Sequence, residues 1–172
     1  LEFEGTAVAT AILTVAEVTN FVDEQTFILE DAVGTLHTFT IETGDDLTAS
    51  NKVGLAGAIS AGGSAGNTAA AVKIAAAINA GTCAATITAT SALAVVTLVQ
   101  DFKGIDGNTL ITNTLASGDL TITQHFKGGG GNTMLVGVLF PAMAADTDVP
   151  SLADSFMFDG TTGLSASLAD NF

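Results

Sequence analysis

Alternating hydrophobic and polar residues mark the clearest element of this chain, a β-hairpin. Apolar and polar side chains alternate over Thr26–Glu30 and again over Leu36–Ile41. The sequence between them, DAVGT, is short and offers a glycine for the turn. Upstream, residues Thr6–Val18 are rich in Thr and Val, which favour extended structure. They predict one or two further strands.

An alanine-rich segment, NTAAAVKIAAAINAG, predicts a helix. Asn67 or Thr68 can cap its start, and Gly81 stands where a left-handed residue would end it. The preceding residues, Thr43–Gly66, are polar and rich in glycine. We expect them to form a long surface loop.

Threonine-rich strands should follow the helix. The pattern places them at Ala85–Thr90, Ala94–Gln100 and Leu120–His125, with a short strand at Leu110–Thr112. The order of strands, hairpin, helix and strands predicts an α+β fold. In this fold, one main helix lies against one face of a mostly antiparallel sheet, and the domain covers residues 1–127.

Two stretches of the chain nearly repeat each other. VTLVQDFKGIDGNT (Val96–Thr109) and LTITQHFKGGGGNT (Leu120–Thr133) have identical residues at eight matching positions, 24 residues apart. We call this pair the doubled stretch. Each copy predicts a strand of the same sheet that ends in Phe-Lys-Gly and leaves through a Gly-Asn-Thr turn.

The doubled stretch contains the residues that we expect to matter for assembly. Phe102 and Phe126 would lie at equivalent strand ends and pack against the domain. Lys103 and Lys127, half of the lysines, would lie at equivalent exits, where they can offset nearby acids or face a neighbouring subunit.

Residues 128–172 are predicted to form a hinge and a C-terminal arm. The hinge is the glycine run Gly128, Gly129, Gly130 and Gly131. The arm repeats SLADSF at 151–156 as SLADNF at 167–172, and it carries four of the ten phenylalanines: Phe140, Phe156, Phe158 and Phe172. Such apolar residues need a surface to cover, on the same domain or on a neighbouring chain.

Composition restricts the possible partners. Hydrophobic residues make up 48% of the 172 positions and charged residues only 13%, which argues against a disordered chain and against a charged coiled coil. The formal net charge of −14 opposes binding to nucleic acid phosphates and to anionic membranes, which require Lys and Arg. The longest apolar runs are too short to span a bilayer. The chain begins with Leu1 rather than Met, which we interpret as processing or as part of a longer protein.

No convincing catalytic constellation emerges from the sequence, and we expect no enzyme and no cofactor. GGGGNT lacks the Gly-Lys-Ser/Thr ending of a phosphate loop, and no G-x-S-x-G elbow occurs. His37 and His125 have no nearby ligand partners, and the scattered acids match no calcium motif. Solvated turn acids are the simpler interpretation. Cys83, the single cysteine, is expected to be buried filler.

Two motifs resemble a known family. FILEDAVGTLHTFTI, with its key positions at Leu29–Phe39, and the segment Thr97–Thr112 within ATITATSALAVVTLVQDFKGIDGNTLIT are similar to a small β-rich domain of tailed-bacteriophage structural proteins, especially from marine phages. The similarity covers roughly residues 6–127 and carries no catalytic residues.

The resemblance implies a virion component that works by assembly: a capsid decoration or head-fibre protein, or a tail-associated subunit. Its expected partners are further copies of itself and other capsid or tail proteins, and its expected location is the virion. Two alternatives stay open. The composition of Thr, Ala, Gly and Asp also suits a bacterial or archaeal surface adhesin or filament subunit. The other alternative is a carbohydrate-binding tailspike module, although a chain without Trp and Tyr lacks the usual stacking platform for sugars.

Overall fold

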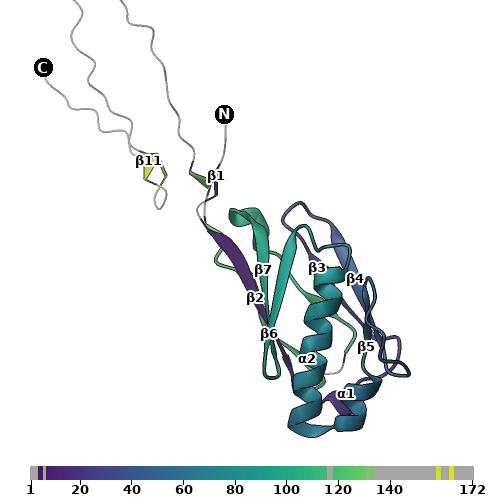
Figure 1. Ribbon diagram of the computed structural model, residues 1–172. Coiled ribbons are helices and arrows are strands. Elements are labelled where there is room, and N and C mark those ends of the chain that lie inside the picture. Colours follow the sequence, from purple (N-terminus) through teal and green to yellow (C-terminus); the bar gives the residue numbers. More distant parts are fainter. Residues whose placement is uncertain are drawn as a thin grey trace, which may run out of the picture. The chain divides into compact units, whose positions relative to one another are not determined.

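Strand β2 (Val8–Val15) lies inside a four-stranded sheet of order β6-β7-β2-β9. It pairs antiparallel with β7 (Val95–Lys103) and with β9 (Leu120–Lys127), and β6 (Ile87–Ala92) pairs antiparallel with β7 (Figure 1). The four odd-numbered positions of β2 are buried and the four even-numbered ones are half-buried. One face of this sheet, the inner face, therefore faces the core.

The computed structural model describes residues 4–5, 7–115, 118–130, 132–133, 158–159 and 163–164. Contacts divide the chain into a first unit, Leu1–Leu135, and a second unit, Val136–Phe172. Each unit contains a two-residue antiparallel ladder. These ladders, with their bounds, are β1 (Glu4–Gly5) with β10 (Asn132–Thr133), and β11 (Phe158–Asp159) with β12 (Gly163–Leu164).

The predicted hairpin is confirmed and belongs to a second four-stranded sheet of order β5-β4-β3-β8. Strands β3 (Thr26–Glu30) and β4 (Leu36–Glu42) pair antiparallel, and β8 (Thr112–Asn113) extends the sheet beside β3. Strand β5 (Lys52–Gly54) pairs parallel with β4. The strands thus divide between two sheets, whereas the sequence predicted one.

The segment Thr43–Gly66 is not a long loop, and this prediction was wrong. It contains β5, helix α1 (Ala56–Ala61) and the first turn of helix α2 (Gly63–Ala80). Helix α2 packs on β6, β7 and β2 of the first sheet (Figure 1). Short 3₁₀ turns occur at Val18–Asn20 and Ile105–Gly107.

Helix α2 begins four residues earlier than predicted, and neither Asn67 nor Thr68 caps it. Gly62 occupies the N-cap position. Asn67 instead fastens the helix to the chain after β2, because its Oδ1 accepts from the Val18 amide at 2.8 Å and its Nδ2 donates to the Ala16 carbonyl at 2.8 Å. Asn67, which the sequence suggested as the helix cap, therefore makes a tertiary contact instead.

Gly81 ends α2 for a different reason than the one predicted. Its φ is −83°, so it is not left-handed. A Cβ on Gly81 would lie 2.7 Å from Asn51 Oδ1 and 2.9 Å from Phe39 Cε1, closer than real Cβ atoms approach. Glycine is needed here because β4 and the loop before β5 press against the end of the helix.

The α+β fold class is confirmed, with mostly antiparallel strands and one main helix. The core between the sheets and helices is made of Val, Ile, Leu, Ala and Phe. Within this core, the rings of Phe27 and Phe39 stack across the β3–β4 ladder with centroids 4.9 Å apart.

Candidate functional site

The turn between β3 and β4 is built around the side chain of Asp31. Its Oδ1 accepts from the backbone amides of Val33 at 3.1 Å and Thr35 at 2.9 Å. Its own amide donates to the Thr35 carbonyl, and Gly34 donates to the Asp31 carbonyl. A carboxylate that accepts from the backbone two residues on is the usual way for Asp to hold a tight turn.

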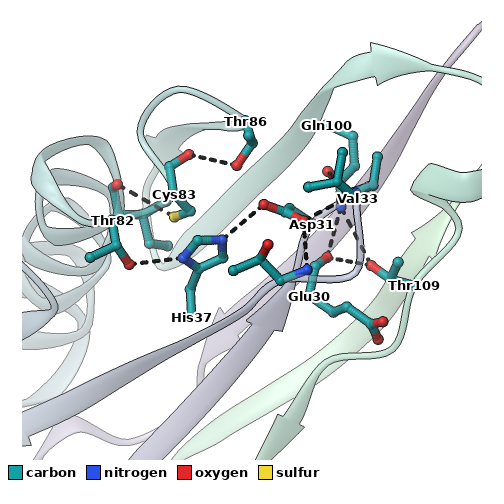
Figure 2. A network of polar contacts seen from close by, with 12 residues as sticks. Glu30, Asp31, Val33, His37, Thr82, Cys83, Thr86, Gln100 and Thr109 are labelled. Carbon is teal, nitrogen blue, oxygen red and sulfur yellow. Dashed lines mark hydrogen bonds and ion pairs between the residues drawn. The ribbon is translucent and has the colours of Figure 1, made fainter.

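His37 lies beside Asp31 and joins this turn to the end of helix α2 (Figure 2). Its Nε2 lies 3.0 Å from Asp31 Oδ2, and its Nδ1 lies 2.8 Å from the hydroxyl of Thr82. Because an ionised carboxylate only accepts, Nε2 carries a hydrogen and donates it to Asp31. In the neutral ring, Nδ1 then accepts from the Thr82 hydroxyl.

Two opposing effects act on the pKa of Asp31. Burial alone raises it, but the contacts from His37 and from the amides of Thr35 and Val33 favour the charged form. The net result is a pKa below its usual value. Asp31 is therefore a carboxylate that serves as a hydrogen-bond acceptor for both the turn and the imidazole.

Asp31, His37 and Thr82 follow the order of carboxylate, imidazole and hydroxyl in a nucleophilic triad. The surrounding contacts favour a structural interpretation. The Thr82 hydroxyl also accepts from Asn51 Nδ2 at 3.1 Å, and the Thr82 amide donates to Asn51 Oδ1 at 2.8 Å. Asn51 in turn donates to the Thr38 carbonyl of β4. The Thr82 hydroxyl thus contacts both His37 and Asn51, and these contacts connect β4 to the end of the helix.

Gln100 holds the same turn from the first sheet. It is fully buried, its Oε1 accepts from the Ala32 amide at 3.1 Å, and its Nε2 donates to the Glu30 carbonyl at 2.9 Å. Thr109 also donates to the Glu30 carbonyl, at 2.6 Å (Figure 2). We call these contacts, together with those of Asp31 and His37, the hairpin tie. In it, the segments Leu29–Phe39 and Thr97–Thr112 contact each other.

Cys83 is buried next to the tie. Its Sγ donates to the Ile78 carbonyl at 3.7 Å, and burial raises the pKa of the thiol to about 11. At neutral pH the group is a thiol rather than the reactive thiolate. The expectation of a buried cysteine is confirmed.

The two copies of the doubled stretch form strands of one sheet, as predicted, and β2 lies between them. Their phenylalanines differ. Phe126 is 3% exposed and joins the core, whereas Phe102 is 49% exposed, so the packing prediction was wrong for Phe102. Lys103 and Lys127 both end their strands and are exposed.

The glycine run lies within the first unit, and two of its residues are hydrogen-bonded to other parts of that unit. Gly129 and Asn108 exchange two hydrogen bonds, from Gly129 N to Asn108 Oδ1 at 2.9 Å and from Asn108 Nδ2 to Gly129 O at 3.3 Å. The amides of Gly130 and Gly104 both donate to the Ala7 carbonyl. A Cβ on Gly129 would clash with the carbonyl of Gly104. Gly129 is therefore required for close approach, and a hinge role for the run stays a prediction.

Of the other predicted assembly residues, the structure describes only the backbone of Phe158, in β11. The remaining four lie outside the described residues: Gly131, Phe140, Phe156 and Phe172.

Other candidate chemistry finds no support in the part of the chain that the structure describes. No group of three or more His, Cys, Asp or Glu side chains converges there as a metal site would need. His125, weighed as a metal ligand, accepts from the Ile111 amide at 3.0 Å. Among the described helices, none has the length and apolar character to cross a membrane.

The hairpin tie was not predicted as a unit. Asp31 and Gly34 gave a turn signal, but Gln100, Thr82 and Asn51 lie far from them in sequence and carry no local signature. Comparisons with known proteins add nothing to the assignment: no family model, curated protein or solved structure matches the chain.

Proposed function

We propose that this chain is a structural subunit of a tailed-phage virion, a capsid decoration, head-fibre or tail-associated protein that acts by assembly rather than by catalysis. The proposal starts from the resemblance of the segments Leu29–Phe39 and Thr97–Thr112 to domains of such proteins. A resemblance between turn signatures is specific only if the residues that define it have a common structural purpose.

The observation that supports the proposal best is the hairpin tie. Asp31 and His37 come from the first motif, Gln100 and Thr109 come from the second, and each bonds to the turn or to the end of α2. The motif residues thus specify one fold. Their polar groups bond to backbone and side-chain groups of the same chain, which suits a subunit that must keep its shape while its surface binds neighbours.

Mass spectrometry of purified phage particles that carry this gene tests the proposal. We expect the chain in the particles at a copy number that matches a symmetric set of capsid or tail positions. Its complete absence from the particles, or its release as a free protein that hydrolyses or binds cell-wall glycans, would contradict it.

A further inference from the structure

Lys103 and Lys127 lie on one face of the first sheet, at the same end of β2. Lys103 is opposite Val8 and Lys127 is opposite Thr10. Directly opposed residues of antiparallel strands point to the same face, and Val8 and Thr10 alternate with the buried Ala9. Both lysines therefore lie on the outer face, with Cα atoms roughly 12 Å apart from the strand spacing and rise.

These two lysines differ from the other two of the chain in their partners. Lys52 pairs with Glu42 at 2.7 Å, and Lys73 pairs with Asp46 at 3.2 Å. Within the described residues, neither Lys103 nor Lys127 has a carboxylate partner. Two uncompensated cations side by side are unusual for a chain with 18 acids and a net charge of −14.

The surface around these lysines is mostly aliphatic and carries one acid of β7, the exposed Asp101, which accepts from the Thr88 hydroxyl. Helix α2 packs on the inner face, and the outer face carries half-buried aliphatic and threonine side chains. At the exit of β7, Phe102 is 49% exposed and Ile105 is 53% exposed. We define the lysine face by its outer-face members, which are Val8, Thr10, Ile12, Val99, Asp101, Lys103 and Lys127.

The sequence of the second unit is complementary in charge to the lysine face. Residues 136–172 contain five Asp and no Lys, Arg or His, because all four lysines fall between 52 and 127. An Asp-x-Phe unit occurs twice, as Asp154 with Phe156 and Asp170 with Phe172. Each unit offers one carboxylate and one large apolar side chain, and the lysine face offers two cations on an apolar surface.

We propose that the two Asp-x-Phe units of one copy bind the lysine face of a second copy, with Asp154 and Asp170 paired to the two lysines. The phenylalanines cover the aliphatic residues between the lysines and at the exit of β7. This inference rests on the proposed role in assembly and names the surface and the segment that would bring it about.

The described chain after β9 stays near the start of β2, because Gly130 donates to the Ala7 carbonyl and β10 pairs with β1. Both lysines lie beside this end of β2. We place the contact between two copies because a symmetric exchange of segments builds the homo-oligomer that the proposed function requires.

A charge exchange in the full-length chain, followed by sedimentation velocity at low salt, tests the proposal. One variant carries Lys103→Glu and Lys127→Glu, and the other carries Asp154→Lys and Asp170→Lys. Each should self-associate at least about tenfold more weakly than the parent chain, since like charges then oppose each other. The 1:1 mixture should recover the association. In it, the glutamates on the face of the first variant meet the lysines in the Asp-x-Phe units of the second variant, and the lysine face of the second variant meets the aspartates of the first.

The second variant separates specific pairing from general repulsion. Each Asp→Lys change adds two positive charges, so its net charge falls in magnitude from −14 to −10. General repulsion between acidic chains predicts stronger association, whereas the proposal predicts weaker association. Lys52→Glu is the matched control: it alters an exposed lysine that is paired within its own chain, and association should be unchanged.

Three results would overturn the inference: a parent chain that stays monomeric at all concentrations, a lysine variant that associates like the parent, or a mixture that fails to recover. These outcomes are distinguishable from a failure of the proposed function, because the presence of the chain in phage particles is measured independently. Circular dichroism and thermal melting of each variant confirm that the exposed substitutions leave the fold intact.

Discussion

Asn108 and Gly129 are joined by two hydrogen bonds, one in each direction, of 2.9 and 3.3 Å. Asn108 belongs to the first copy of the doubled stretch and Gly129 to the second. The two copies are thus fastened to each other where they leave the sheet.

Gly129→Ala should destabilise the domain by about 1–3 kcal/mol, because the added methyl meets the backbone of Gly104 and the chain must shift. Urea unfolding of the full chain measures the loss. Gly44→Ala is the control, since a Cβ there meets nothing within 4 Å, and its stability should be unchanged or slightly higher. Equal stability of the two variants would contradict the close approach of the Gly129 Cα to the Gly104 carbonyl.

The glycine run therefore cannot be tested by replacing all four residues with alanine. Gly128 has a φ of +88°, a conformation that strains an alanine, and Gly129 lacks the space. A loss of fold in such a variant would report these local constraints and would say nothing about a hinge.

Gln100→Ala should cost about 2–4 kcal/mol of unfolding free energy, because it leaves the half-buried amide of Ala32 without its partner and opens a cavity at a fully buried position. Gln124, the equivalent residue of the second copy, is the matched control. It is only partly buried, and its Nε2 donates to the carbonyl and, at 3.5 Å, to the hydroxyl of Thr10, so Gln124→Ala should cost about 1 kcal/mol. Chemical denaturation measures the stability loss of both variants. A larger loss for Gln124→Ala than for Gln100→Ala would refute the role of the hairpin tie.

Asp31 should make stability depend on acidic pH. Its pKa is lowered in the folded state, so its contribution is complete above the usual value near 3.8 and is lost as the pH falls through the folded pKa. Asp31→Asn should be less stable at pH 7 by about 2–4 kcal/mol, since one amide oxygen cannot accept from both the turn and His37. Urea unfolding at pH 7 and at successively lower pH values should show the difference from the parent chain narrow below pH 4. A constant difference would be inconsistent with this linkage.

Cys83 should react very slowly with a thiol reagent in the folded protein. With a pKa of about 11, only about 0.1% of the group is thiolate at pH 8, and burial blocks access. The absorbance of released thionitrobenzoate, followed with and without urea, measures the rate. Rapid reaction of the native chain would show that the loop after α2 opens readily.

Much of the fold follows from local patterns. The hairpin was correct because Thr26–Glu30 and Leu36–Ile41 alternate with a short turn between them. Helix α2 and the strands of the doubled stretch were found within a few residues of their bounds. These elements carry their periodicity in their own residues.

Other features depend on contacts distant in sequence. Strand β5 is only three residues long and pairs parallel with β4, so no alternation could mark it. Helix α1 was hidden by its glycine and serine content, which resembles a loop. The division of the strands between two sheets, and the meeting of Gln100 with the turn at Asp31, are properties of the packed chain alone.

Electron cryomicroscopy of particles of a phage that carries this gene gives the sharpest test of the proposed virion role. We expect density for the α+β domain in a repeating, symmetric array on the capsid or tail, with the lysine face turned toward a neighbouring copy. A particle map without density for the domain, or with an isolated copy whose lysine face lies in open solvent, would refute the proposal.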